Sequence, residues 1–291
     1  MRLDHLAHIV VLIGQFQLDY TLAILLRNQR DYTLQVCLLL LELRAIVITN
    51  DIADIGLLDC TNNRLETVHP FGKEISFTTI YLDNNRITRL YAAEDGYFCG
   101  LGQMETLSCA NNCLTELPDI FTAQSIYTVQ SVNFSSNNIS RLENGDNWRG
   151  INSSSLNLAD NCFEELPARL MKSGSKIKTL MLSSNGMRKI AEGALMGPYS
   201  YYLTTVDLSF NRLKEIPFDD FSALNMPYLY GIDLSSNAFE AFPYAPLGIN
   251  PLTVMSIRQQ RDDAGNRTLR EWPTGLYTCP KMSAFYIGSN D

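Results

Sequence analysis

Apolar and polar positions recur along the chain in a fixed order around a series of asparagines. Apolar residues lie three, five and usually eight positions before each of these asparagines, and two and five positions after it. Alternation of this kind is typical of a β-strand, whereas Asn favours turns. The pattern therefore predicts one short strand and one turn in every unit. Eight asparagines, 22 to 27 residues apart, mark units one to eight: Asn63, Asn85, Asn112, Asn137, Asn161, Asn185, Asn211 and Asn237.

The order of the apolar positions resembles the leucine-rich repeat motif, L-x-x-L-x-L-x-x-N-x-L-x-x-L, from residue 52 to residue 291. Unit seven reads Leu203, Val206, Leu208, Asn211, Leu213 and Ile216. The resemblance implies an α/β solenoid with a curved parallel sheet on the concave side and short helices and loops on the convex side. The segments Glu164–Ser173 and Phe218–Leu224 are long enough for such a helix or helical turn.

The asparagines are predicted to form a ladder along the interior of the coil. A side-chain amide carries two donors and one acceptor, enough to satisfy backbone groups of its own unit and of neighbouring units. The predicted ladder comprises the eight asparagines above and Asn290 in unit ten. Four units continue with a proline directly after the last apolar position, and this proline is expected to end the extended run and direct the chain to the convex side. These are Pro118, Pro167, Pro217 and Pro243.

Unit nine departs from the pattern. Gln260 occupies the ladder position, and the polar residues 261–267 follow it before Leu269 and Trp272–Pro273 resume the motif. We expect the ladder to be interrupted here and a loop to leave the coil. Loops on a rigid scaffold often carry function, but a surface insertion is also tolerated at low cost in stability. Both interpretations of the loop stay open.

The two ends of the chain do not follow the repeat. Residues 1–50 are predicted to be an unassigned apolar leader or an irregular N-terminal cap, followed by a leucine-rich repeat domain of about ten units over 51–291. The chain ends at Asp291, part-way through unit ten, and we interpret it as truncated there. The apolar runs within residues 1–50 are too short for a membrane-spanning helix.

Three segments narrow the resemblance. The residues Ile257–Asp262, Gly265–Pro273 and Ile287–Asp291 resemble the leucine-rich repeat surface proteins and lipoproteins of gut Bacteroidota, which are mostly uncharacterised. This resemblance implies a cell-surface or secreted location. The residues themselves provide neither a clear signal peptide nor a lipobox, because no small-x-small cleavage site follows the first apolar run.

Charge and cysteine content exclude several kinds of function. The net charge is -8, with 23 Lys+Arg against 31 Asp+Glu, so a broad basic face for nucleic acid is not expected. Of the seven cysteines, Cys60 and Cys109 occupy inward positions, and Cys113 and Cys162 follow a ladder Asn. We expect these four to be small buried residues rather than disulfides or metal ligands. No catalytic motif occurs, so we predict no enzyme activity, no metal and no cofactor.

The concave face is predicted from the residues that alternate with the apolar strand positions. Its candidate ligand-binding residues are Asp59, Tyr81, Asp83, Asn133, Asn157, Asp207, Phe210, Asp233, Arg258 and Tyr286. Asp207 and Asp233 occupy the same position on adjacent strands, where like charges repel. Either a basic group of a partner relieves this repulsion, or the two are ordinary hydrated surface carboxylates.

The sequence thus favours a non-catalytic interaction module. It would recognise a protein or a glycan, whose identity the sequence leaves open, through the concave face and the inserted loop. The alternative is that the repeats select the substrate of a larger enzyme, of the effector-ligase type, whose catalytic domain lies outside this chain. A third hypothesis is a purely structural spacer without a ligand.

Overall fold

The structure is a computed structural model of the 291-residue chain. It describes residues 10–16, 19–25, 30–35, 43–49, 53–69, 71, 75–91, 104–120, 129–145, 148, 150–168, 170–171, 176–197, 200–217, 219–221, 224–243, 252–270, 281–288 and 290. Trp272–Pro273, expected to resume the motif after the loop, lies outside these residues.

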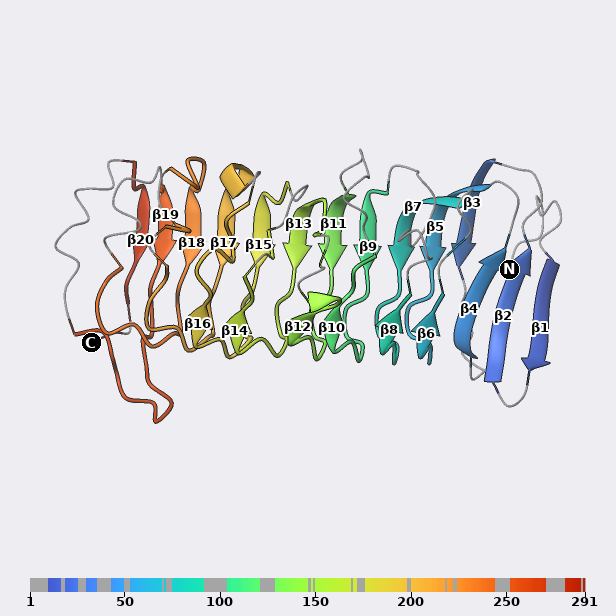
Figure 1. The fold of residues 1–291 in the computed structure, drawn as a ribbon, viewed down its shortest axis with the longest axis horizontal. Helices are drawn as coiled ribbons and strands as arrows, with labels where there is room; N and C mark the ends of the chain where they lie inside the picture. The colour runs from blue at the N-terminus through green and yellow to red at the C-terminus, as the bar shows by residue number, and fades with distance from the viewer. Residues whose placement is uncertain are drawn as a thin grey trace.

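One parallel sheet of eleven strands runs along the whole solenoid (Figure 1). We call it the main sheet. Each of the ten predicted units contributes one strand, and neighbouring strands pair in the order of the sequence. The ten are β5 (Ala53–Asp59), β7 (Ile75–Tyr81), β9 (Thr106–Ser108), β11 (Val129–Asn133), β13 (Ser153–Asn157), β15 (Thr179–Met181), β17 (Thr205–Asp207), β18 (Gly231–Asp233), β19 (Val254–Ser256) and β20 (Ala284–Tyr286). The parallel solenoid predicted from the sequence is confirmed.

The apolar position five residues before each ladder residue forms the centre of the core. Its members pair directly across the strands, as Leu107 does with Val132 and Val132 with Leu156. From unit one to unit nine they are at most 3% exposed: Leu58, Ile80, Leu107, Val132, Leu156, Leu180, Val206, Ile232 and Met255. Burial of each such side chain contributes about 1.5–3 kcal/mol, so the column fixes the register of every coil.

A second layer of two-residue strands follows the turns. It comprises β6 (Thr67–Val68), β8 (Arg89–Leu90), β10 (Glu116–Leu117), β12 (Arg141–Leu142), β14 (Glu165–Leu166) and β16 (Lys189–Ile190). Figure 1 shows them in a row beside the main sheet. Unlike the main sheet, this layer is divided, because β8 does not pair with β10 and β12 does not pair with β14.

The prolines explain where the second layer is divided. In units two, four and six, the residue after the last apolar position donates its N–H to a carbonyl of the preceding unit. These bonds are Tyr91 N to Val68 O at 3.1 Å, Glu143 N to Leu117 O at 3.0 Å and Ala191 N to Leu166 O at 3.1 Å. Pro118 and Pro167 hold the same position in units three and five and have no N–H to donate. Each division of the layer falls at one of these prolines.

The expected convex helices are largely absent from the described residues. The described part of Glu164–Ser173 contains β14 and turns, and that of Phe218–Leu224 contains turns alone. The described residues contain no α-helix, and the helix whose bounds they give is a 3-10 helix, η2, at Ser200–Tyr202. The prediction was wrong here because a few residues beyond a proline cannot repay the cost of nucleating an α-helix. The α/β description therefore reduces to a parallel β-solenoid.

Both layers extend into the first fifty residues. The strand β3 (Arg30–Gln35) pairs in parallel with β5 and adds to the main sheet, while β4 (Leu43–Thr49) pairs in parallel with β6. An antiparallel pair, β1 (Val10–Phe16) and β2 (Asp19–Leu25), continues from β4. The domain division at residue 50 stays a prediction.

Candidate binding surface

The asparagines form the interior ladder, and Asn161 is representative. Its Nδ2 donates to the carbonyl oxygen of Phe134 in the preceding unit at 2.9 Å, and to those of Leu158 and Ala159 in its own unit at 3.2 and 3.1 Å. Its Oδ1 accepts the N–H of Ile139 at 3.0 Å. One buried side chain thus bonds four backbone groups of two neighbouring units, and the N–H of Ile139 has no other partner within the described residues. The ladder asparagines of units two to eight all make this set of bonds and hold the ends of their strands in a fixed place.

Gln260 does not interrupt the ladder, contrary to the sequence prediction. The side chain is fully buried; its Nε2 donates to Leu234 O at 2.9 Å and Arg258 O at 3.0 Å, and its Oε1 accepts from Phe239 N at 3.1 Å. A Gln amide carries the same donors and acceptor as Asn on a longer stem. The ladder continues to Asn290, whose Oδ1 accepts the N–H of Gln260 at 2.7 Å. The insertion therefore begins after the ladder residue and leaves the main sheet intact.

From unit one to unit nine, the residue directly before the ladder position has a left-handed backbone conformation. The φ angles lie between 53° and 58° at Asn62, Asn84, Asn111, Ser136, Asp160, Ser184, Phe210, Ser236 and Gln259. Asn and Asp adopt this conformation most readily among residues with a side chain, whereas a bulky residue is strained there. Phe210 is the one aromatic residue among these nine. It is 62% exposed, so packing does not explain why a bulky side chain stands at this position. Strain of this sort often marks a functional position.

Five candidate residues of the concave face also close the strand ends. The Oδ1 of each accepts the N–H of the residue two positions on, at 2.8 to 3.1 Å. These are Asp59, Asn133, Asn157, Asp207 and Asp233. The backbone hydrogen bonds between main-sheet strands do not use that N–H, so an Asp or Asn at this position satisfies it. In unit three, where Ser108 stands instead, Asp83 from unit two accepts from Ala110 N at 2.6 Å. Much of the acidic character predicted for the face therefore has a structural use.

Asp207 and Asp233 retain one oxygen each for other contacts. They are directly paired across β17 and β18, and both are half-buried. Each uses Oδ1 for its own strand end, and no contact of either Oδ2 occurs within the described residues. Phe210 lies three residues beyond Asp207. The arrangement places two half-buried carboxylates side by side on the main sheet and an exposed phenylalanine in the turn that follows β17.

Arg258 and Tyr286 form a second group at the C-terminal end of the face. The guanidinium carbon of Arg258 lies 4.5 Å from the centre of the Tyr286 ring, a cation–π contact. Tyr286 is 43% exposed. Tyr81, by contrast, is a half-buried side chain among polar neighbours in unit two. Phe210, Arg258 and Tyr286 therefore lie in units seven to ten. Asp59, Tyr81 and Asp83 lie in units one and two, at the other end of the main sheet.

The inserted loop is an ordered hairpin, visible as the orange loop that projects from the coil near the C-terminus in Figure 1. A bridge between Arg261 and Arg267 joins its two arms. The side chain of Asn266 donates from Nδ2 to Asp262 Oδ2 at 2.9 Å, and the backbone N–H groups of Asn266 and Ala264 donate to Asp262 Oδ1 at 2.8 and 3.0 Å. These hydrogen bonds, that of the Asn266 side chain first, fix the turn and lower the pKa of this exposed carboxyl. At the base, Thr268 Oγ1 donates to Phe239 O at 2.8 Å. The loop therefore has a defined shape on the scaffold.

The tip of the hairpin is tied back to earlier coils. The carboxylate of Asp263 lies 3.1 Å from Arg188 Nη2 in unit six and 3.3 Å from Arg212 Nε in unit seven. One carboxylate thus bridges arginines from two neighbouring units. These contacts could not be found from the sequence, because the partners are 75 and 51 residues apart.

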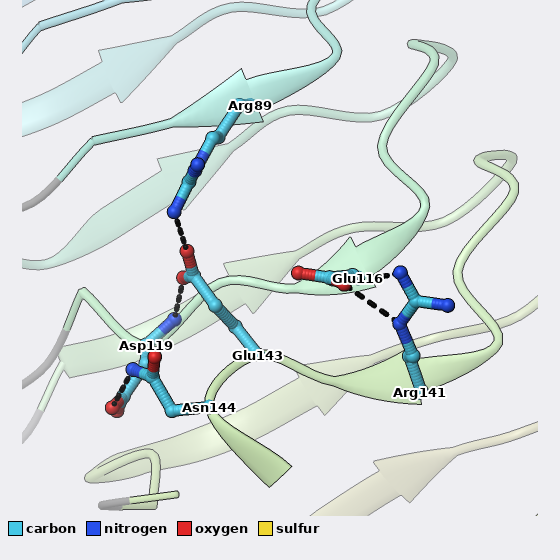
Figure 2. A network of polar contacts seen from close by, with 6 residues as sticks. All are labelled: Arg89, Glu116, Asp119, Arg141, Glu143 and Asn144. Carbon is cyan, nitrogen blue, oxygen red and sulfur yellow. Dashed lines mark hydrogen bonds and ion pairs between the residues drawn. The ribbon is translucent and has the colours of Figure 1, made fainter.

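A polar network lies where the second layer first divides (Figure 2). Arg89 Nη2 reaches past unit three to Glu143 Oε1 at 2.9 Å, and Glu143 Oε2 accepts from Asp119 N at 2.7 Å. Asn144 Nδ2 donates to Asp119 Oδ2 at 2.9 Å. A hollow of about 220 Å³ beside it is lined by Thr88, Leu90, Leu114, Pro118 and Glu143, among others. Side-chain contacts thus connect the layer where Pro118 removes the backbone bond.

The cysteines are only partly as predicted. Cys60 and Cys109 are buried and free, and burial raises the pKa of the Cys60 thiol to about 12 and that of Cys109 further. Cys162, however, is exposed and Cys113 is half-buried, so the expectation of four buried cysteines was wrong. Both follow a ladder Asn directly, a position at which Arg64, Arg86 and Arg212 stand in other units, and which therefore points outward.

Among the residues that the structure describes, no group of three or more His, Cys, Asp or Glu side chains is placed to hold a metal ion. No helix in the same residues has the length and apolar character needed to cross a membrane.

Comparison with known proteins identifies the family. The Leucine Rich Repeat family model matches residues 202–224. The crystal structure of a leucine-rich repeat protein from Bacteroides eggerthii superposes with a TM-score of 0.75 at 36% identity, over 86% of this chain and 44% of that chain. The chain is a leucine-rich repeat protein. A second such structure, from Bacteroides thetaiotaomicron, gives a TM-score of 0.73 at 37% identity, over 84% of this chain and 32% of that chain.

A more distant relative is a much longer protein of which the matched segment is a small part. Leucine-rich repeat serine/threonine-protein kinase 1 from Mus musculus is 27% identical over 231 residues, which are 78% of this leucine-rich repeat protein and 11% of the kinase. The chain therefore spans less than half of each of the three proteins compared.

Proposed function

We propose that this leucine-rich repeat protein is a non-catalytic binding module that recognises a protein or glycan partner through the concave face of units seven to ten and the inserted hairpin. The observations that carry the proposal are the pairing of Asp207 and Asp233 across β17 and β18, with no contact of either Oδ2 within the described residues, and the strained, exposed Phe210 three residues beyond Asp207. Aromatic rings on a rigid surface often anchor interfaces, and two adjacent carboxylates favour a basic group of the partner.

The main sheet supports this role physically. Every coil from unit one to unit nine has its ladder residue and its buried central residue in register, so the outward side chains lie on a rigid support. A preorganised surface loses little conformational entropy on binding. The similarity to Bacteroides proteins favours a cell-surface or secreted location.

The decisive variant is the double substitution Asp207→Asn with Asp233→Asn. Asn stands naturally at the same position in units four and five, where its Oδ1 accepts the same N–H. The substitution therefore removes two charges and leaves the strand ends closed. A matched control, Glu165→Gln with Glu240→Gln, removes two exposed carboxylates that do not lie on the main sheet.

Partners would be captured from bacterial and host extracts, and glycans would be screened on an array. Binding of the purified partner would then be measured by calorimetry. We expect the concave-face variant to weaken binding about tenfold or more and the control variant to change it less than about twofold. Equal binding by all three proteins would remove the two aspartates from the proposal, and the absence of any saturable ligand would reject it.

The second candidate function, substrate recognition for a larger enzyme, is favoured by one comparison. The matched kinase contains a related segment as 11% of its length. Reading the gene beyond this chain tests it: a catalytic domain in the same open reading frame would favour the enzyme, and its absence would favour the stand-alone module.

A further inference from the structure

The inserted hairpin brings two arginines into an unfavourable pairing. Arg261 and Arg267 are direct partners across its arms. The flanking hydrogen bonds, Asp262 N to Asn266 O at 2.8 Å and Thr268 N to Gln260 O at 3.1 Å, show that they form the non-hydrogen-bonded type of antiparallel pair. In this type the side chains approach most closely, and like charges opposite one another are destabilising.

The two arginines point away from the coil. Gln260 and Thr268 next to them are buried, and side chains alternate along a β-arm, so Arg261 and Arg267 share the opposite, exposed face. Arg261 Nη1 donates to Gly265 O at 3.0 Å, which fixes one guanidinium over the turn. Neither arginine has an ion pair within the described residues. Two guanidiniums, of which that of Arg261 is fixed, therefore lie on an exposed face and have no carboxylate partner within the described residues.

The hairpin is also a local excess of positive charge on an acidic protein. Together with Arg188 and Arg212, which hold its tip, it carries four arginines against Asp262 and Asp263, whereas the whole chain has a net charge of -8. Asp263 shows how such a pair is satisfied, since its single carboxylate contacts two guanidiniums at 3.1 and 3.3 Å. Arg261 and Arg267 offer a similar pair of donors outward.

We propose that Arg261 and Arg267 bind a carboxylate in an acidic peptide segment of the partner protein. The inference rests on the proposed function and names the partner chemistry at the hairpin. A guanidinium matches a carboxylate with two parallel hydrogen bonds. A long polyanion is disfavoured, because its affinity depends on many contacts along a basic surface, and here two arginines are paired on the hairpin of a chain with a net charge of -8.

The test uses fluorescein-labelled tetraglutamate and the complete chain, with fluorescence anisotropy at low and at physiological salt. We expect Arg261→Gln with Arg267→Gln to weaken tetraglutamate binding about tenfold or more, and Arg261→Lys with Arg267→Lys to weaken it by an intermediate factor. The control, Arg64→Gln with Arg86→Gln, removes two exposed arginines remote from the hairpin and should change binding less than about twofold.

Stability separates a binding role from a structural one. If the pair serves binding, the Arg261→Gln, Arg267→Gln variant should unfold at the same temperature as the parent protein or higher, because the like-charge pair is removed. A lower unfolding temperature would indicate a structural role and contradict the proposal. Equal weakening in the hairpin and control variants, or no saturable binding of tetraglutamate, would overturn it.

A sulfated heparin tetrasaccharide tests the ligand class. Tighter binding of the sulfated sugar than of tetraglutamate, lost in the same hairpin variant, would also overturn the peptide assignment. The Asp207→Asn, Asp233→Asn variant should bind tetraglutamate at least as well as the parent. Failure at the hairpin is therefore distinguishable from failure of the concave-face proposal.

Discussion

The main sheet and the second layer are built by the same coils, yet one is continuous over eleven strands and the other is divided into separate pieces. The difference comes from backbone donors. The main-sheet strands of units two to nine are each followed by a buried amide side chain, whereas two of the second-layer connections meet a proline that lacks an N–H. The comparison shows which face of the solenoid is rigid enough to present a recognition surface.

The largest effect is expected when the ladder itself is broken. Asn161→Ala removes four hydrogen bonds and leaves the buried N–H of Ile139 without a partner, so we expect the free energy of unfolding to fall by about 4 kcal/mol. Urea denaturation measures the change. Asn138, an exposed asparagine of the preceding unit, provides the control. Asn138→Ala should lower the free energy of unfolding by less than about 0.5 kcal/mol. Similar losses in both variants would mean that the ladder is not what holds the main sheet.

A new proline should divide the second layer at another place. Ala191→Pro removes the N–H that bonds to Leu166 O at 3.1 Å between β14 and β16. We expect a loss of about 2 kcal/mol, from the bond itself and from the carbonyl left unpaired. Hydrogen exchange should become faster in β16 and remain slow in β15 and β17. Unchanged stability and exchange would show that the natural prolines do not cause the divisions.

A smaller change of opposite sign is expected at Phe210. Phe210→Asn places at φ 54° the residue type found at the same position in units one to three, and relief of strain should raise the free energy of unfolding by about 1 kcal/mol. Thermal unfolding measures the gain. Binding of the partner should weaken in the same variant, because the exposed ring is lost. Reduced stability would mean that Phe210 is retained for packing rather than for recognition.

The smallest effect is expected for an ion pair of the second layer. Lys189 and Glu165 lie 3.7 Å apart and are 65% and 51% exposed, so solvent screens their attraction. Lys189→Ala should change the free energy of unfolding by less than about 0.5 kcal/mol at moderate salt. Denaturation with and without 1 M salt checks this, and a loss above about 1 kcal/mol would show that charge contacts hold this layer together.

The parts of the fold that repeat along the sequence were predictable. The spacing of Leu, Val and Asn specified the parallel sheet and the ladder, because each position recurs in every unit with the same environment. The prediction of helices on the convex side was wrong, because the length of a segment does not show whether it forms a helix or a series of turns. The ladder continues through Gln260, contrary to the prediction, because its side-chain amide makes the same kind of hydrogen bonds as an Asn.

The candidate site was predictable only as a list of outward positions. Alternation places Asp207 and Asp233 on the face, but it does not show that one oxygen of each closes a strand end. The strain at Phe210 depends on a backbone angle, and the pairing of Asp263 with Arg188 depends on how a loop folds back across several coils. Such contacts between distant residues leave no periodic signal in a single sequence.

The most direct test of the central claim is hydrogen exchange of the chain with and without its captured partner. The account predicts slower exchange in β17, β18 and β19 and in residues 261–267 of the complex, with β14 and β16 of the second layer unchanged. Protection confined to the second layer, with the concave strands unaffected, would contradict it.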